Sequence, residues 1–352
     1  MLQSSRKALA SDGALVCLPA VSVESGLMLL VSLLSVPAAL VVPAPLSAQA
    51  LDPQGTGVWD RAALEAAHEG ALLAAAKRTP WPSPSAEALC EEGVVYVPNA
   101  VSTTTAAALR TLCETTLQSK LDAVASGEAS YGACFGTVRA RTARHDLKLG
   151  LEPTISDALA EALDTLGPLP SSALECDDPF LAALGAVGSC QGAPRQLMHA
   201  DTRCFASPEL MTAFIALQDI DEEMGPTTFL PGTHNAHSHA AMLSSKDELL
   251  SAGPVRLGAM PAGASTLYDP RVLHAGGANG SPRGRWLFYA TFAASRSVAD
   301  EIHGVQYAEL QRAVHTVGTL RRSASKHEQH AGRSAEEEEE WAKVWAAMER
   351  KE

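Results

Sequence analysis

Six short apolar runs, separated by segments rich in Gly, Pro, Asn and Asp, follow Pro179 and constrain the fold more than any other feature of this sequence. They lie at residues 196–199, 211–220, 227–230, 255–257, 265–268 and 286–293. Runs of this length between turn-forming residues predict β-strands. In the last run apolar side chains occupy both sets of alternating positions, so we expect that strand to be covered on both faces. The sequence therefore predicts a sheet that packs against a second sheet or against helices.

The first half of the chain predicts mainly helices. Helices are expected at residues 60–77, from about 102 to 125, and at 156–166, because alanines and leucines recur there at helical spacing. A β-branched run at 93–98 predicts a short strand. Three prolines within residues 79–85 predict a rigid linker after the first helix.

The first fifty residues predict a targeting presequence. Arg6 and Lys7 precede an apolar stretch at residues 27–42, and Ala-Gln-Ala follows at 48–50. The stretch is shorter than the roughly 20 residues that span a membrane and is typical of a signal peptide. Cleavage would give a mature chain that starts near Leu51, has no stable membrane span, and enters the secretory pathway or an organelle. A cytoplasmic protein is expected if the presequence is not functional.

The charge balance excludes nucleic acid as a partner. The chain has 27 Lys and Arg against 40 Asp and Glu, a net charge of −13, and no long basic cluster. Such a chain repels phosphate backbones. The six cysteines beyond residue 50 show no metal-ligand spacing, so they are expected as buried thiols: Cys90, Cys113, Cys134, Cys176, Cys190 and Cys204.

His199-Ala200-Asp201 and His274, which end two of the predicted strands, form a candidate metal site. Residues i and i+2 of a strand project to the same face, so His199 and Asp201 can reach one ion and His274 can close the site. Two imidazoles and one carboxylate leave three positions of an octahedral metal open, as an iron(II) centre needs for an organic cosubstrate and O2. Zinc would prefer a fourth protein ligand or a single water. Since the chain has 11 histidines, such spacings also arise by chance, and a second signal is needed.

The second signal is a glycine-rich turn after His274. Residues 276–285 read Gly-Gly-Ala-Asn-Gly-Ser-Pro-Arg-Gly-Arg and deliver an arginine to the start of the next predicted strand. A planar guanidinium can bind a carboxylate through two parallel hydrogen bonds. The cosubstrate 2-oxoglutarate would chelate iron through its keto-acid end and present its other carboxylate to such a residue. Both Arg283 and Arg285 are candidates for this role.

Five segments within residues 86–295 match, in order, those of a known enzyme family. They are Glu92-Gly-Val-Val-Tyr-Val-Pro98, Gln196-Leu-Met-His199-Ala-Asp201, the segment 217–226 that ends in Gly-Pro, Phe229-Leu-Pro-Gly-Thr-His234, and His274 with Asn279, Ser281 and Arg285. With these segments the chain resembles the phytanoyl-CoA dioxygenase family of iron(II)- and 2-oxoglutarate-dependent oxygenases. Arg285 is preferred over Arg283 because it stands where the family's Asn-x-Ser-x-x-x-Arg pattern has its arginine.

The resemblance implies an α+β fold with a mainly β core, a double-stranded β-helix (jelly roll, cupin-like) with flanking N- and C-terminal helices. It implies iron(II) held by His199, Asp201 and His274, with 2-oxoglutarate and O2 as cosubstrates and Arg285 as the partner of the distal carboxylate. The family's halogenating relatives replace the metal-binding carboxylate with a small residue. Because Asp201 is retained, hydroxylation or another oxidation is favoured over halogenation.

Two further polar residues are candidates for the site. Gln196, three residues before His199, can support its strand or hydrogen-bond the cosubstrate. His234 follows a Pro-Gly turn and is a candidate for substrate contact, whereas His237 and His239 are expected on a loop or helix start rather than in a second metal site. The segment 144–146, Arg-His-Asp, is expected to make structural polar contacts, with substrate binding as the alternative.

The chain is thus expected to contain a presequence at 1–50, an alanine-rich helix and linker at 51–85, an oxygenase domain at 86–300 and a helical, acidic tail at 301–352. The expected activity is hydroxylation, or another oxidation, of an unactivated C–H bond in a small lipid-like or secondary-metabolite substrate. Two alternatives remain: a protein or peptide hydroxylase of the secretory pathway, and a non-catalytic β-helix binding module whose His and Asp residues are satisfied core groups. The oligomeric state is not predicted.

Overall fold

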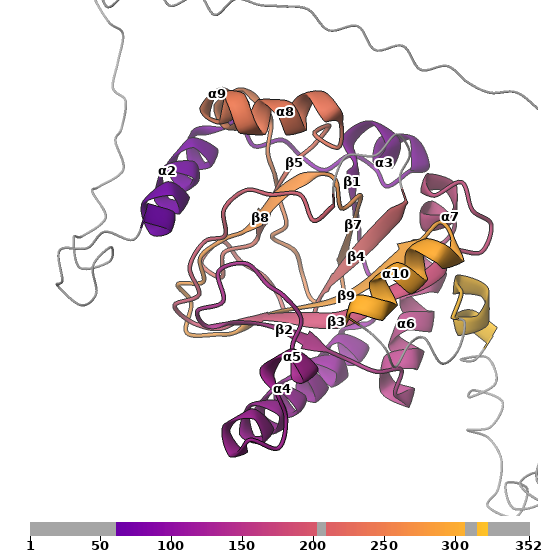
Figure 1. Cartoon of the computed structure of the whole chain (residues 1–352). Coiled ribbons are helices and arrows are strands. Elements are labelled where there is room, and N and C mark those ends of the chain that lie inside the picture. Colours follow the sequence, from indigo (N-terminus) through magenta and orange to yellow (C-terminus); the bar gives the residue numbers. More distant parts are fainter. Residues whose placement is uncertain (1–60, 203–208, 307–314, 323–352) are drawn as a thin grey trace, which may run out of the picture. The chain divides into compact units, whose positions relative to one another are not determined.

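The computed structural model describes residues 61–202, 209–306 and 315–322, in which helices flank two antiparallel β-sheets (Figure 1). The predicted presequence at 1–50 lies outside the described residues, as does most of the predicted tail at 301–352. No helix in the described part of the chain is long and apolar enough to cross a membrane.

The larger sheet has six strands in the order β1-β7-β4-β9-β3-β2, and every neighbouring pair is antiparallel. These strands are β1 (Val94–Val97), β2 (Arg144–Lys148), β3 (Phe180–Ser189), β4 (Leu210–Ala216), β7 (Ser265–Tyr268) and β9 (Arg285–Ala293). The smaller sheet has the order β6-β5-β8 and is also antiparallel. It contains β5 (Thr227–Leu230), β6 (Arg256–Leu257) and β8 (Leu273–Gly276). The mixed α/β fold therefore has the mainly β core that the sequence predicted.

The strand pattern differs from the sequence prediction at three places. The run at 196–199 is not a strand, because it pairs only through an isolated bridge between His199 and His274. Strands β2 and β3 were not predicted at all. β3 is rich in Ala and Gly, which disfavour strands in general. A Cβ at Gly188 would lie 2.7 Å from the Trp286 ring, so this glycine leaves room for a side chain of β9.

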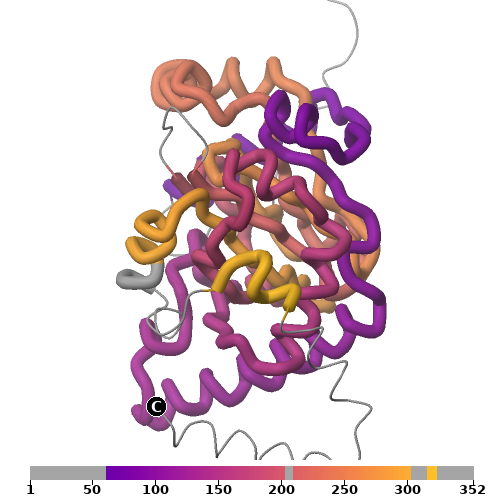
Figure 2. Tube along the Cα trace, turned by 90° about the vertical axis from the view of Figure 1, so that its right-hand side faces the viewer, coloured from indigo at the N-terminus to yellow at the C-terminus, as the bar shows by residue number. Residues whose placement is uncertain are grey.

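The helices predicted in the first half of the chain are present, and short helices add to them. The helices include α2 (Arg61–Ala75), α3 (Ala86–Glu92), α4 (Thr103–Ser126), α5 (Tyr131–Cys134), α6 (Pro153–Leu166), α7 (Leu169–Ala173), α8 (Ala236–Ser244), α9 (Lys246–Ala252) and α10 (Arg296–Gln306). Ser102 caps α4, as its hydroxyl accepts a hydrogen bond from the backbone N–H of Thr105 at 3.1 Å. In both views α8 and α9 lie at one end of the described structure and α4 at the opposite end (Figure 1, Figure 2).

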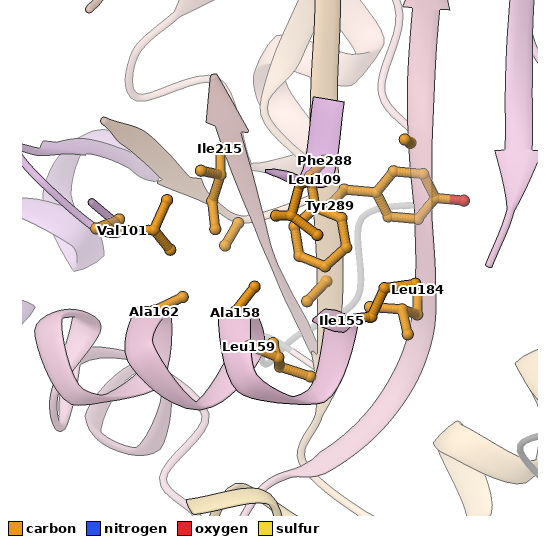
Figure 3. Packing of buried hydrophobic residues seen from close by; sticks show 14 of the residues in the cluster. Val101, Leu109, Ile155, Ala158, Leu159, Ala162, Leu184, Ile215, Phe288 and Tyr289 are labelled. Atoms are coloured by element: carbon orange, nitrogen blue, oxygen red, sulfur yellow. The ribbon is translucent and has the colours of Figure 1, made fainter. Parts of the chain in front are cut away.

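One face of the larger sheet is covered by α4 and α6. Buried side chains of α6, among them Ile155 and Leu159, pack against Phe288 of β9 and Ile215 of β4 (Figure 3). The other face of β9 carries Leu287, Tyr289 and Thr291, which line a pocket. All nine residues of β9 are buried, as the sequence predicted for a strand covered on both sides.

The five described cysteines are free thiols. Cys113 and Cys134 are buried as expected, whereas Cys90 is exposed and Cys176 and Cys190 are partly buried. Cys204 lies outside the described residues.

Gly225, in the turn before β5, is expected to be indispensable for stability. Its φ is +65°, and a Cβ there would lie 2.1 Å from the carbonyl oxygen of Ala278. We expect Gly225→Ala to lower the free energy of unfolding by at least about 3 kcal/mol, since backbone strain and steric overlap add. Gly192→Ala is the control: its φ is +81° but its Cβ would meet open space, so a loss of about 1–2 kcal/mol is expected. Equal losses in denaturant unfolding would contradict the steric argument.

Candidate metal and cosubstrate site

His199, Asp201 and His274 converge at one place. The backbone N–H of His199 donates to the carbonyl of His274 at 3.0 Å, and the reverse bond measures 2.7 Å. Asp201 then places one carboxylate oxygen 3.5 Å from Nε2 of His199 and the other 3.4 Å from Nε2 of His274. The candidate ligand atoms all lie within 4.8 Å of one another, and no other group of this kind occurs among the described residues. The isolated bridge between His199 and His274 is therefore enough to bring the three side chains together, although the predicted strand at 196–199 is absent.

The second nitrogen of each imidazole is held by the backbone. Nδ1 of His199 lies 2.8 Å from the carbonyl oxygen of Leu197, and Nδ1 of His274 lies 2.9 Å from that of Val272. Because a carbonyl only accepts, the proton of each neutral ring resides on Nδ1. The lone pair of each Nε2 is therefore free for a metal, which is the arrangement that metal-binding histidines require.

The pKa shifts of Asp201 and His274 also suit a metal. Burial raises the pKa of Asp201, but the imidazoles of His274 and His199 and a hydrogen bond from Tyr268 (3.2 Å) outweigh it and lower that pKa to about 2. Burial lowers the pKa of His274, which favours the neutral ring. An ionised carboxylate and neutral imidazoles are the forms that bind metal ions. The Asp201 side chain remains 43% exposed, so the site is open on one side.

Arg285 is buried with two of its three guanidinium nitrogens unpartnered. Arg285 is only 2% exposed, and its Nη2 donates a hydrogen bond to the hydroxyl of Ser189 at 3.2 Å. Nε and Nη1 have no hydrogen-bond partner. Burial and the nearby Arg144 lower the pKa of Arg285 to about 9. A buried cation without a counter-ion is costly, which marks this position as a place for an anion.

The neighbouring arginines differ from Arg285. The Arg144 guanidinium is satisfied by the Ser189 hydroxyl and the backbone carbonyls of Ala140, Pro194 and Gly277. Arg283 lies at the surface, where it pairs with Asp221. Of the two candidates in the glycine-rich turn, the structure places Arg285 inside and Arg283 outside.

A cavity of about 660 Å³ joins these groups. The residues that line it include the His-Asp-His cluster and Arg285, together with Leu210, Phe214, Tyr289, Thr291 and Ile302. Its volume lies within the range of about 300–1,000 Å³ that is usual for small-molecule sites. One pocket thus contains a metal-ligating cluster, an anion position and a mixed apolar and polar wall.

A family model described as "Phytanoyl-CoA dioxygenase (PhyH)" matches residues 89–286, more than half of the chain. This chain belongs to the phytanoyl-CoA dioxygenase family. It is an iron- and 2-oxoglutarate-dependent non-haem oxygenase, with iron(II), 2-oxoglutarate and O2 as its cofactor and cosubstrates. The residues present fit these groups, since the open His-Asp-His cluster and the unpartnered Arg285 share the pocket. No curated protein sequence matches the chain.

Three solved structures are similar to part of this PhyH-family chain at low sequence identity. The non-heme alpha ketoglutarate dependent carbocyclase SnoK from nogalamycin biosynthesis is 18% identical, with a TM-score of 0.47 over 60% of this chain and 84% of SnoK. AviO1 from Streptomyces viridochromogenes Tue57 is 16% identical, with a TM-score of 0.45 over 59% of this chain and 92% of AviO1. EctD from S. alaskensis, solved with 2-oxoglutarate and 5-hydroxyectoine, is 14% identical, with a TM-score of 0.43 over 62% of this chain and 82% of EctD.

Two other residues predicted for the PhyH-family site have different surroundings. Gln196 lines the pocket, but both ends of its amide bind backbone: Oε1 accepts from Gly276 N–H at 2.8 Å and Nε2 donates to the Arg139 carbonyl at 3.1 Å. His234 does not line this pocket, and its Nε2 lies 3.0 Å from the carbonyl oxygen of Cys90. The structure therefore brings Gln196, but not His234, to the site.

Asp146, Tyr289 and Arg139 line the pocket of this PhyH-family member, although the sequence did not predict them as site residues. Asp146 of β2 is buried in the wall and accepts a hydrogen bond from the Tyr289 hydroxyl at 2.9 Å. Burial raises the pKa of Asp146 to about 6. Arg139, an exposed residue of the loop before β2, lines the same pocket. Because β2 is short and its sequence polar, alternation gave no signal that Asp146 would face inward.

Proposed function

We propose that the chain oxidises a C–H bond of a small molecule, with iron(II) held by His199, Asp201 and His274 and 2-oxoglutarate held through its distal carboxylate by Arg285. The observation that carries this proposal is the buried, incompletely partnered Arg285 guanidinium in the same pocket as the three ligand side chains. A non-catalytic fold would gain nothing from such a charge, whereas a bound carboxylate would satisfy it.

The protein's own part in the reaction is to bind, orient and enclose. When bound, iron with 2-oxoglutarate and O2 supplies the oxidising chemistry. The backbone carbonyls behind His199 and His274 keep both rings turned toward the ion. Arg285 fixes the orientation of the cosubstrate, and the apolar side chains of Leu210, Phe214 and Ile302 exclude water from the remaining space.

We propose a double-stranded β-helix, or jelly roll, as the finer description of the fold. Two antiparallel sheets with the pocket lined by strands of both support it. We also retain the domain division at residues 50, 85 and 300, and entry into the secretory pathway or an organelle through the presequence, as proposals.

The proposed substrate is a small molecule with an apolar body and at least one hydrogen-bonding group. The pocket lining combines apolar side chains with the Asp146–Tyr289 pair and with Thr212 and Thr291, whose hydroxyls lie 2.9 Å apart. Each pair is hydrogen-bonded internally, but its carboxylate and hydroxyl oxygens can accept further hydrogen bonds. A plain hydrocarbon chain that displaced water would leave this capacity unused, which disfavours its binding. This composition favours an oxygen- or nitrogen-bearing secondary metabolite over a simple fatty acyl chain. Hydroxylation is the proposed reaction because the carboxylate of Asp201 is retained in the metal-ligating cluster.

Anaerobic titration with iron(II) and 2-oxoglutarate tests the proposed cofactor sites. We expect a weak visible metal-to-ligand charge-transfer band that saturates at one iron and one 2-oxoglutarate per chain. Admission of O2 should then release succinate, faster when a substrate is present. A folded chain that shows neither the band nor succinate would overturn the proposal and favour the binding-module alternative.

A further inference from the structure

Helix α2 lies outside residues 89–286, which the family model matches, yet it places a carboxylate behind the metal site. Glu69 of α2 is completely buried. Its Oε2 accepts a hydrogen bond from the backbone N–H of Met198 at 2.7 Å, and its Oε1 pairs with Nζ of Lys246 from α9 at 2.6 Å. Met198 immediately precedes His199. Helix α2 therefore contacts the segment that carries two candidate metal ligands, His199 and Asp201.

The segment before His199 needs such a contact because it is not a strand. Residues 193–198 have no regular structure, and β8 binds only the N–H groups of Gln196 (2.9 Å) and His199 (3.0 Å) in this region. The N–H of Met198, a residue only 5% exposed, is bound by Glu69 instead. A buried N–H without an acceptor would destabilise this conformation, so the carboxylate substitutes for the missing neighbouring strand.

Apolar packing connects the same elements. The Met198 side chain belongs to a buried cluster with Leu73 of α2, Leu250 of α9, and Leu273 and Ala275 of β8. Helices α2 and α9 lie side by side near β8 (Figure 1). Both segments that carry candidate metal ligands, the one ending in His199 and strand β8 with His274, thus pack in one cluster with α2.

The charges around Glu69 keep its carboxylate in place. Lys246 contacts the carboxylate directly. The side chain of Arg195 packs against the neighbouring residue of α2, since a Cβ built on Gly70 would lie 3.3 Å from Arg195 Cδ. Lys246 also pairs with Glu65, which lies one turn earlier on α2. The Glu65 side chain is 43% exposed, and none of its hydrogen bonds or ion pairs reaches the segment that carries His199 and Asp201. The two glutamates share one lysine but differ in whether they reach Met198.

We propose that Glu69 is a positioning residue for the metal centre: by binding the Met198 N–H it holds the backbone on which His199 and Asp201 are presented. The inference rests on the proposed function, in which these two side chains and His274 bind iron(II). Preorganised ligands bind a metal more tightly because less conformational freedom is lost on binding. Removal of Glu69 therefore weakens metal binding without touching the metal ligands or the cosubstrate arginine.

The test compares Glu69→Ala with Glu65→Ala in the full chain. Glu69→Ala is expected to weaken iron(II) binding by about 10- to 100-fold, as measured by anaerobic titration well below the unfolding temperature. The KM for 2-oxoglutarate at saturating iron should stay within about twofold of wild type. Glu65→Ala should leave both quantities within about twofold, although it also removes a partner of Lys246. Glu69→Gln, which retains an oxygen acceptor for Met198, should give an intermediate loss and serves if the alanine variant does not fold.

A metal-free measurement separates this inference from the proposed function. In the apo chain, amide hydrogen exchange of the peptide that contains Met198 should be faster in Glu69→Ala than in Glu65→Ala. Unchanged exchange and unchanged iron affinity in a folded Glu69 variant, or equal losses in both alanine variants, would overturn the positioning role. If wild type itself binds no iron while the exchange difference is present, the proposed function fails but the contact with Met198 does not.

Discussion

Asp201→Ala is expected to lose the charge-transfer band and to reduce 2-oxoglutarate turnover by at least about 1,000-fold, because two imidazoles without the carboxylate hold iron(II) poorly. The carboxylate lies between the two Nε2 atoms at 3.5 and 3.4 Å and supplies the only negative charge of the three ligands. The fold should survive, since the side chain is 43% exposed and belongs to a pocket wall rather than to the apolar core. Anaerobic absorption titration and succinate release measure the two losses.

Asp221→Ala is the matched control for this variant. Asp221 is a surface carboxylate whose guanidinium partner, Arg283, is also exposed, so its removal should change neither quantity. Retention of iron binding and turnover by folded Asp201→Ala would show that the metal is held elsewhere.

Arg285→Met is expected to raise the dissociation constant for 2-oxoglutarate by about 30-fold or more while iron(II) affinity stays close to wild type. Removing one partner of a buried charge pair costs about 2–5 kcal/mol, and each 1.4 kcal/mol is tenfold in affinity. The same variant should raise the melting temperature of the ligand-free chain. Its apolar side chain replaces a buried cation whose Nε and Nη1 have no partner, and such replacements are often stabilising. Calorimetry with and without 2-oxoglutarate measures both effects.

Arg283→Met provides the comparison for the second variant. Arg283 is two residues away but exposed and paired with Asp221, so cosubstrate affinity should be unchanged. Equal loss of 2-oxoglutarate affinity in the two variants would remove Arg285 from its proposed role. A lower melting temperature of ligand-free Arg285→Met would show that its contact with Ser189 matters more than its uncompensated charge.

The sequence pattern located the site better than it located the strands around it. The triplet His199-Ala-Asp201 and the glycine-rich turn after His274 are local sequence features. Residues so close in the chain stay close in space whether or not the segment beside them forms a regular strand. That is why the convergence of His199, Asp201 and His274 was predictable although the expected strand at 196–199 is only a bridge. The family identified from these motifs is confirmed by the match over residues 89–286.

Strand β3 was missed for a physical reason that its own sequence does not show. β3 is built of small residues because Tyr289 and Trp286 of β9 occupy the space above its glycines, and that requirement is not visible in β3 alone. A Cβ at Gly185 would lie 2.6 Å from the Tyr289 hydroxyl. Strand propensity describes a residue in an average environment, whereas each of these glycines is required by the side chain of one particular neighbour on β9.

By itself the sequence determined the chemistry of the chain: the family, the three candidate metal ligands and the two arginines that compete for a carboxylate. Those properties depend on residue type and on short spacings, which the chain carries locally. Only the tertiary structure decided which arginine is buried, that Asp146 faces the pocket, and that Glu69 holds Met198 from 129 positions away. Burial and partnership of this kind arise when distant segments pack together, and no local pattern encodes which segments will meet.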